Sequence, residues 1–258
     1  MYTPFDLTGR GAVVTGGNGG IGYGMARGLL AAGASVAVWG SNPDKTEQAK
    51  IKLAAECGDA SRVHAMVCDV GDESQVDAAF AASVAALGQV DACFANAGVS
   101  GKGTALMDMP LQEFQRVQRI NVEGVFLTFR AAARHMVANG QGGSLVATAS
   151  TAALEGAARN CHYGASKGAV TSLVRALAME LARHRIRVNS ILPGWIVTEM
   201  TERSVANDKF ASAVMPRIPA RRWGEIDDFS GIAVYLASQA SGYATGEQFV
   251  IDGGYTKF

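Results

Sequence analysis

Short apolar runs alternate along the chain with longer Ala-rich stretches of helical period. Seven runs rich in β-forming residues are predicted as strands, at 12–15, 35–39, 62–67, 90–95, 144–148, 187–192 and 248–251. Runs such as Val-Ala-Val-Trp are continuously apolar, as expected for strands buried on both faces of a parallel sheet. The alternation therefore predicts repeated βα units, which build an α/β fold with helices around a parallel sheet.

Polar residues mark two of the helix starts. Asn42 before Pro43 predicts an N-cap with proline in the first turn, and Asp72 with Gln75 three residues later predicts a capping box. No linker rich in Pro, Ser or charge divides the chain, and no repeat occurs, so we expect one domain over residues 1–258. The weakly periodic stretch 195–222 predicts a mobile lid, with an ordinary surface excursion as the alternative.

Composition narrows the class of partner. The 258 residues suit one large core, and 23 basic residues balance 23 acidic ones, which leaves no net field to attract nucleic acid or an anionic membrane. The first residues lack a basic segment followed by an apolar one, and no 18-residue apolar run occurs. We therefore expect a cytoplasmic protein that acts on a small molecule.

Cysteine and histidine give no sign of a metal site. Cys57, Cys68, Cys93 and Cys161 form no CxxC pair, which favours buried free thiols, and the four histidines form no ligand motif. No metal is expected.

A glycine-rich turn directly follows the first predicted strand. It reads Thr-Gly-Gly-Asn-Gly-Gly-Ile-Gly over residues 15–22 and leads into a helical stretch. Glycines allow a close approach to a pyrophosphate, and the free amides of a helix start favour negative charge. The alternative is a βα turn that binds nothing, but the position after the first strand favours a dinucleotide. The residues expected to bind it are Gly16, Asn18, Gly19, Ile21 and Gly22.

The end of the second strand bears on the choice between NAD and NADP. An acid there commonly holds the ribose hydroxyls of NAD, but here Gly40 is followed by Ser41 and Asn42. The lack of a carboxylate favours NADP, whereas the lack of a guanidinium at Ser41 leaves NAD open. Ser41 and Asn42 are expected to bind the cofactor, with capping of the next helix as the alternative. Asp69, at the end of the third strand, is expected to touch the adenine ring.

Tyr163 and Lys167 lie four residues apart in a helical stretch and so share one face of the helix. A nearby ammonium in a partly dry cleft is expected to lower the phenol pKa toward neutrality, as a proton-transfer residue needs. The alternative is a coincidental surface pair. Only one of the seven lysines follows a tyrosine at this spacing, which favours catalysis.

Two further polar residues are candidates for the same site. Ser150 ends the fifth strand, where its hydroxyl could reach a substrate oxygen, although Thr148 or Thr151 could be mistaken for it. Asn121 lies within the long helical stretch 111–139, where its low helix propensity indicates either a useful side chain or a local distortion.

Together these segments resemble the short-chain dehydrogenase/reductase family from about Leu7 to Tyr255. The matching residues are Thr-Gly-x-x-x-Gly-x-Gly at 15–22, Asp69-Val70, Asn96-Ala97-Gly98, Asn121, Ser150, Tyr163-x-x-x-Lys167, Pro193-Gly194 with Thr198, and Asp252-Gly253-Gly254. The resemblance implies a single-domain Rossmann fold, with a seven-stranded, doubly wound parallel sheet flanked by helices. It also implies a hydride transfer between NADP or NAD and a carbonyl or secondary alcohol.

The resemblance assigns a role to each candidate. It makes Tyr163 the general acid or base, with Ser150 bonding the reacting oxygen and Asn121 supporting a water in the proton relay. Lys167 would hold the nicotinamide ribose and lower the tyrosine pKa. Residues expected against the cofactor are Asp69, Val70, Asn96, Ala97, Gly98, Tyr163, Lys167, Pro193, Gly194, Ile196 and Thr198.

Two residues depart from the family pattern. Ala95 replaces the first asparagine of the usual Asn-Asn-Ala-Gly run, and Ser41 stands where NADP-preferring members often have arginine. The family usually forms tetramers through two long helices, here 111–139 and 163–184, so a homotetramer is expected.

Other functions remain open on the sequence alone. A dinucleotide-binding regulator or scaffold on the same fold is one, and a lyase or epimerase using the same tyrosine is another. For the substrate, Arg159, Asn160 and His162 could face a sugar acid or polyol, or be solvated loop residues. A 3-oxoacyl substrate is also considered, because the basic run from Arg183 to Arg187 could meet an acidic carrier protein, although Gln141 lacks the expected second charge.

Overall fold

A computed structural model describes residues 3–257 of the chain. Met1, Tyr2 and Phe258, which the expected domain includes, lie outside the described residues. The seven predicted strands are confirmed, and their observed bounds are β1 (Gly11–Thr15), β2 (Ser35–Gly40), β3 (Val63–Val67), β4 (Ala92–Ala95), β5 (Gly143–Thr148), β6 (Ile186–Pro193) and β7 (Gln248–Ile251).

All seven strands pair in parallel in one sheet of order β3-β2-β1-β4-β5-β6-β7. The order reverses between β1 and β4, where the chain turns from one half of the sheet to the other. In open α/β sheets such a switch point opens a crevice at the carboxyl ends of the strands. This is the Rossmann-type arrangement, as expected.

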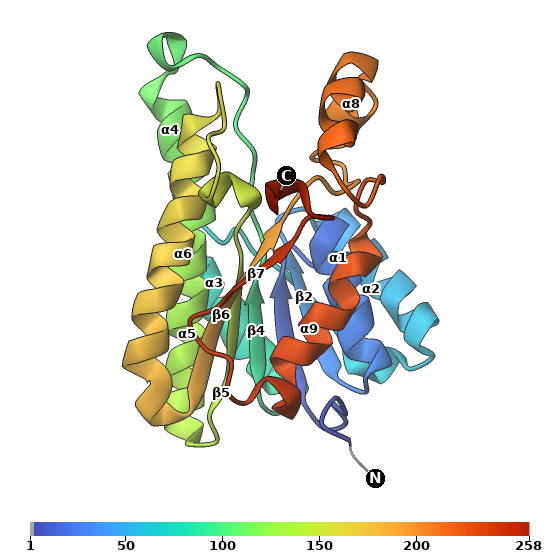
Figure 1. Ribbon diagram of the computed structural model, residues 1–258. Helices are drawn as coiled ribbons and strands as arrows, with labels where there is room; N and C mark the ends of the chain where they lie inside the picture. Colours follow the sequence, from blue (N-terminus) through green and yellow to red (C-terminus); the bar gives the residue numbers. More distant parts are fainter. Residues whose placement is uncertain (1–2, 258) are drawn as a thin grey trace.

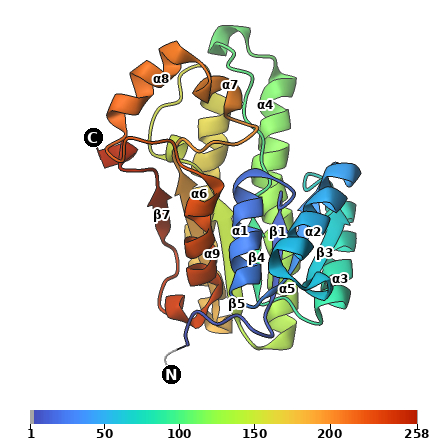
Figure 2. The same cartoon turned by 90° about the vertical axis from the view of Figure 1, so that its right-hand side faces the viewer.

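Helices cover both faces of the sheet (Figures 1 and 2). They are α1 (Gly20–Ala31), α2 (Pro43–Cys57), α3 (Glu73–Leu87), α4 (Leu111–Gln118), α5 (Gly124–Asn139), α6 (Cys161–Leu181), α7 (Glu202–Val205), α8 (Asp208–Val214) and α9 (Ser230–Ala237). Helices α3, α5 and α6 pack on one face, and α1, α2 and α9 on the other. Alternate residues of β1 divide between these layers, since Val13 joins the first core, and Ala12 and Val14 the second.

The predicted helix starts are observed with one difference. The Asn42 side chain accepts the Lys45 amide at 2.9 Å, and the Asp72 side chain accepts the Gln75 amide at 3.1 Å. The capping box was wrong in detail, because Gln75 does not bond back to the Asp72 amide. Its Oε1 instead accepts the amide of Asp69 at 3.0 Å, so it fastens the end of β3 to the start of α3.

The segment 195–222 rises from the carboxyl edge and carries α7 and α8 (Figure 2). Its base is closed by main-chain pairing, in which Gly224 donates to Trp195 and accepts from Val197, each at 2.9 Å. The Phe210 ring packs edge-on against Trp195 at 4.8 Å between centroids. The segment therefore has a packed interior and a base held by main-chain hydrogen bonds, while its motion as a lid stays a prediction.

Candidate active site

The glycine-rich turn joins β1 to α1 at the switch point of the sheet. Gly16 has φ +63°, and a Cβ there would lie 3.0 Å from the Cα of Ala97, so β1 and the end of β4 approach too closely for a side chain. At Gly22 a Cβ would meet the carbonyl oxygen of Gly16 at 2.4 Å. At both positions another main-chain segment lies too close for a side chain, so only glycine fits.

The first turn of α1 is suited to a phosphate. Its N-cap residue, Gly19, offers no side-chain hydrogen bond, and no acidic residue lies in the first turn. The amides at this end therefore keep their capacity to bind an anion, and the helix dipole favours negative charge there. A dinucleotide pyrophosphate fits this part of the site.

Asn96 ties three strand ends together. Its side-chain nitrogen donates to the Thr15 carbonyl oxygen at 3.1 Å, and its side-chain oxygen accepts from the Thr148 hydroxyl at 3.0 Å. Its amide also donates to the Thr15 hydroxyl, at 3.0 Å. The Asn96 side chain thus holds the floor of the crevice, and leaves Ala97 and Gly98 to line it.

A cleft of about 310 Å³ opens above this floor. It brings together residues from the glycine turn, the ends of β4 and β5, helix α6 and the segment after β6. The lining residues are Gly16, Asn18, Gly19, Gly20, Ile21, Lys45, Asn96, Ala97, Gly98, Val99, Thr148, Ala149, Ser150, Tyr163, Lys167, Pro193, Gly194, Ile196, Thr198, Glu199, Met200 and Thr201.

Tyr163 and Lys167 meet in this cleft from the same face of α6. The Lys167 ammonium lies 5.7 Å from the centre of the Tyr163 ring and donates to the main-chain oxygen of Thr148 at 2.8 Å. Ser150, at the tip of β5, interacts through its hydroxyl with the phenol. An acid–base side chain, a hydroxyl donor and an ammonium therefore share one small space.

The acid–base properties differ from the expectation. Burial raises the pKa of Tyr163 above its usual 10.0, and the hydrogen bond with Ser150 lowers it by less. Burial also lowers the pKa of Lys167 from 10.5 to about 8. Burial thus sets the direction of the Tyr163 pKa, against the expected lowering, while the Lys167 ammonium donates to the Thr148 main-chain oxygen.

Asn121 lies in a π-helical segment, Arg119–Glu123, between α4 and α5. Its side chain is fully buried, accepts the Val99 amide at 2.8 Å, and donates to the Val99 carbonyl and the Ser166 hydroxyl, each at 3.0 Å. Both alternatives left open by the sequence are therefore realised. The side chain holds the loop after β4 against α6, and the helix is locally distorted.

The adenosine-end candidates lie around the carboxyl ends of β2 and β3. Ser41 and Asn42 are exposed, with Asn42 used as the cap of α2. Asp69 accepts the Gly71 amide at 2.9 Å and pairs with Arg119 at 3.1 Å. Val70 is buried against Gly124. None of the four lines the cleft that holds Tyr163, so their contacts with a cofactor stay predictions.

The substrate-side candidates are not gathered in the cleft. His162 has no exposed surface, and Arg159 is exposed with its Nε bonded to the Gly103 carbonyl at 2.9 Å. Closer to the catalytic strand, Glu155 faces Arg217 of the 195–222 segment at 3.8 Å. This pair links the loop after Ser150 to the predicted lid.

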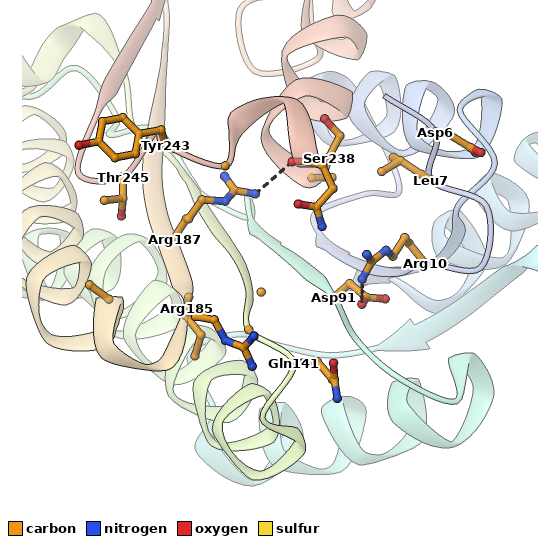
Figure 3. Close-up of a pocket in the computed structure, with 17 residues that line it drawn as sticks. Asp6, Leu7, Arg10, Asp91, Gln141, Arg185, Arg187, Ser238, Tyr243 and Thr245 are labelled. Atoms are coloured by element: carbon orange, nitrogen blue, oxygen red, sulfur yellow. Dashed lines mark hydrogen bonds and ion pairs between the residues drawn. The ribbon is translucent and has the colours of Figure 1, made fainter. Parts of the chain in front are cut away.

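A second cavity, of about 610 Å³, lies at the opposite edge of the sheet (Figure 3). Arg185 and Arg187 of the predicted carrier-binding run line it, and Arg187 donates to the Leu236 and Ser238 carbonyls at the end of α9. The six residue-to-residue steps from Arg187 to Pro193 span about 20 Å at ~3.3 Å per step. The basic run therefore does not flank the mouth of the catalytic cleft.

Sequence reasoning missed Lys45, Glu199, Met200 and Thr201, all of which line the cleft. Lys45 carried a usable signal, because a cation in the first turn of a helix opposes the helix dipole. The other three lie in a segment without periodicity.

The four cysteines differ in their exposure to solvent. Cys68 and Cys93 are buried and Cys57 is partly so, but Cys161 is exposed at the start of α6, which corrects the expectation of buried thiols. Over residues 3–257, no cluster of three or more His, Cys, Asp or Glu side chains is arranged to hold a metal ion. In the same range, no helix has the length and apolar character needed to cross a membrane.

Known proteins resemble the whole chain. A family model described as Enoyl-(Acyl carrier protein) reductase matches residues 16–256. Gluconate 5-dehydrogenase of Gluconobacter oxydans (strain 621H) is 37% identical over 259 residues, which cover 98% of this chain and 96% of that enzyme.

Solved structures agree with this. A short-chain type dehydrogenase/reductase from Mycobacterium marinum has 42% identity and a TM-score of 0.92 over 98% of both chains. A gluconate 5-dehydrogenase from Burkholderia cenocepacia J2315, in complex with NADP and tartrate, has 34% identity and a TM-score of 0.93 over 99% of this chain and 98% of that one.

Proposed function

The chain belongs to the short-chain dehydrogenase/reductase family and is an NAD(P)-dependent enzyme, and we propose that it interconverts a secondary alcohol and a ketone on a sugar acid or related polyol. The observation that carries the proposal is the meeting of Tyr163, Lys167 and Ser150 beside the glycine turn in one cleft. The likeness to gluconate 5-dehydrogenases supports the substrate class.

The cofactor would lie along the carboxyl edge of the sheet. The α1 amides at Gly20 and Ile21 suit its pyrophosphate, and Ala97 and Gly98 would face its ribose side. Residues Pro193 to Thr198 would hold the carboxamide, and Lys167 the nicotinamide ribose. We propose NADP as the preferred form, because Gly40, Ser41 and Asn42 at the end of β2 include no acid and because a relative was solved with NADP.

When bound, the nicotinamide supplies or accepts the hydride. Tyr163 gives its phenolic proton to the substrate oxygen during reduction and takes it back during oxidation. Ser150 donates a hydrogen bond to the same oxygen, which stabilises the charge that develops there. Asn121 keeps the loop after β4 in place beside α6, through its bonds to Val99 and Ser166, and its segment would support the water of the proton relay.

Lys167 would act electrostatically. Its bond to Thr148 fixes the ammonium on the strand that carries Ser150, within reach of the Tyr163 ring. A positive charge in this buried space favours the phenolate over the phenol, in opposition to the effect of burial. Proton transfer near neutral pH thus depends on Lys167 remaining charged.

Oligomeric state and location are parts of the same proposal. Large apolar side chains are exposed on the two long helical stretches, including Phe126 at 45% and Met179 at 85%, which supports a homotetramer built through them. The free thiols support a reducing compartment such as the cytoplasm. One domain over residues 1–258 would carry both cofactor and substrate sites.

A carrier-linked 3-oxoacyl substrate is less well supported. The basic run that would meet a carrier protein lies at the edge of the sheet opposite the cleft. A regulator without turnover would not need the tyrosine, the lysine and the serine together.

The test is a panel of sugar acids, polyols, simple ketones and 3-oxoacyl thioesters, followed by nicotinamide absorbance. Wild type should turn over members of the first two classes, and Tyr163→Phe should lose about 10²–10⁴-fold in kcat while still binding cofactor. Equal turnover by both proteins would remove Tyr163 from its role. Tight cofactor binding with no turnover of any compound would favour the regulator, and product formed without net change in nicotinamide would favour a lyase or epimerase.

A further inference from the structure

A bidentate ion pair between Lys45 and Glu199 joins the start of α2 to the segment that follows β6. The Lys45 ammonium lies 2.7 Å from Oε1 and 2.6 Å from Oε2 of Glu199, although the residues are 154 positions apart. The lysine side chain is 38% exposed and the glutamate side chain 77%. The contact is solvated and so can exchange.

The pair stands at the boundary between two hollows. Lys45 and Glu199 line the 310 Å³ cleft with Tyr163, and both also line a neighbouring hollow of about 700 Å³ that contains Asn42 at the start of α2. Asn18, Gly19 and Gly20 of the glycine turn are likewise shared by the two hollows. The ion pair therefore sits beside the turn that would hold a cofactor phosphate.

The position of the ammonium is electrostatically unusual. Its carbon and nitrogen lie 3.0–3.1 Å from where a Cβ of Gly19 would be, so it faces the positive end of α1. It also belongs to the first turn of α2, where the helix dipole disfavours a cation. The ammonium thus lies near the positive ends of two helices, with Asp44 as the acidic residue of the same first turn of α2. The Glu199 carboxylate meets the ammonium with two oxygens, as a phosphate group would.

We propose that Lys45 is the cationic ligand of a cofactor phosphate and that Glu199 competes with this phosphate for the ammonium. Binding of the dinucleotide exchanges one anion for another, and frees Glu199 and the segment behind it from α2. The phosphate is either the pyrophosphate or the 2′-phosphate of NADP. The inference rests on the NAD(P) dependence of the enzyme. In the case of the 2′-phosphate, Lys45 compensates for the missing arginine at Ser41.

The experiment measures Kd for NADP and for NAD by calorimetry at low salt, in wild type, Lys45→Gln and Glu199→Gln. Matched controls are Lys50→Gln, which removes the partner of Glu47 on the same helix at a position that lines neither hollow, and Glu202→Gln in α7. Lys45→Gln should weaken binding about 10- to 100-fold, the range of a charge-assisted hydrogen bond. Glu199→Gln should tighten it up to about fivefold.

The two ligands identify the phosphate. A loss confined to NADP assigns Lys45 to the 2′-phosphate, and an equal loss for NAD and NADP assigns it to the pyrophosphate. Both effects should shrink as salt rises, because the charges are solvent-exposed. Affinities for both ligands that match the Lys50→Gln control would overturn the role of Lys45. Failure of wild type to bind either ligand would instead contradict the cofactor dependence.

The double variant Lys45→Gln/Glu199→Gln tests the competition. If Glu199 acts through Lys45, the double variant should bind as Lys45→Gln does. Tighter binding than Lys45→Gln alone would overturn the competition and show that Glu199 repels the phosphate directly. Unchanged affinity in the Glu199→Gln single variant would overturn it as well. Thermal melts of each variant confirm that the fold is intact.

Discussion

Lys167 donates to the main-chain oxygen of Thr148 over 2.8 Å, which anchors a buried ammonium of α6 on β5, the strand that leads to Ser150. This contact keeps the lysine from moving freely toward the phenol. The ammonium is buried without a carboxylate partner, so its charged form is destabilised and its pKa is lowered.

The contribution of Lys167 to the stability of the protein should rise with pH between about 8 and 10.5. Burial lowers the folded-state pKa of Lys167 from 10.5 to about 8, so in this window the unfolded chain binds more protons than the folded chain. This contribution then increases with pH, by roughly 3 kcal/mol over the whole window at 1.36 kcal/mol per pKa unit.

Urea unfolding of wild type and Lys167→Met at pH 7.5, 8.5 and 9.5, without added cofactor, checks this. The free energy of unfolding of wild type, relative to that of the variant, should increase at each step in pH. If the unfolding free energies of the two proteins change with pH in parallel, Lys167 has the same pKa in the folded and unfolded states, and the prediction is wrong. Burial also raises the pKa of Tyr163, and raises those of Cys68 and Cys93 to about 12, so these groups lower the stability of both proteins as pH rises. The difference between wild type and variant therefore isolates the contribution of Lys167.

Among the three hydroxyls near the end of β5, only Ser150 should matter for turnover. The Thr148 hydroxyl is already bonded to Asn96, whereas that of Ser150 interacts with the phenol. Ser150→Ala should lower kcat by about 10²-fold or more, as loss of one donor to a developing oxyanion does. Thr151→Val serves as control and should keep kcat within a few-fold. Equal losses in both variants would contradict the assignment.

Gly22→Ala should disrupt the cofactor end of the site. Its Cβ would meet the Gly16 main-chain oxygen at 2.4 Å, so the glycine turn must shift. We expect a loss of about 1–3 kcal/mol in stability and at least tenfold weaker NADP binding.

Gly231→Ala in α9 is the matched control, since a Cβ there meets nothing within 4 Å. It should stabilise the protein by about 0.5–1 kcal/mol through the lower entropy of the unfolded chain, with cofactor affinity unchanged. Thermal melts and calorimetry of both variants measure the contrast. A Gly22→Ala protein with wild-type affinity would show that the turn tolerates a side chain.

Asn121→Ala should cost about 3 kcal/mol in unfolding free energy. The substitution leaves the amide and carbonyl of Val99 and the hydroxyl of Ser166 without their present partner, in a place with no exposed surface. Asn139→Ala, at the exposed end of α5, should stay within about 0.5 kcal/mol of wild type. Urea titration compares the two, and a small loss at Asn121 would mean that water replaces the side chain.

The strands were predictable because continuous apolar runs fit a sheet covered on both faces. The residues at which the strands begin and end were harder to predict. The fourth strand was expected from Val90 but begins at Ala92, since the Val90 amide bonds to Nε2 of His135 on a helix distant in sequence. The long helix 111–139 was expected as one unit, because a π-turn leaves little trace in hydrophobic periodicity.

The tyrosine–lysine pair was also predictable, since its members are neighbours on one helix. The network of Asn96 with Thr15 and Thr148 was not, because it joins three strands that come together only in the folded sheet. The direction of the Tyr163 pKa depends on burial and on where the ammonium of Lys167 rests. Sequence spacing constrains neither quantity.

The π-turn at Arg119–Glu123 carries one residue more than an α-helical turn would. One residue corresponds to about 100° of rotation in an α-helix. Removing a single residue there would regularise the backbone but turn all of α5 about its axis, so that Val125 and Phe129 would leave the core. The extra residue thus fixes the rotation of α5 relative to the π-turn. With this rotation Asn121 bonds to Val99, which lines the catalytic cleft, while the apolar side of α5 packs against the sheet.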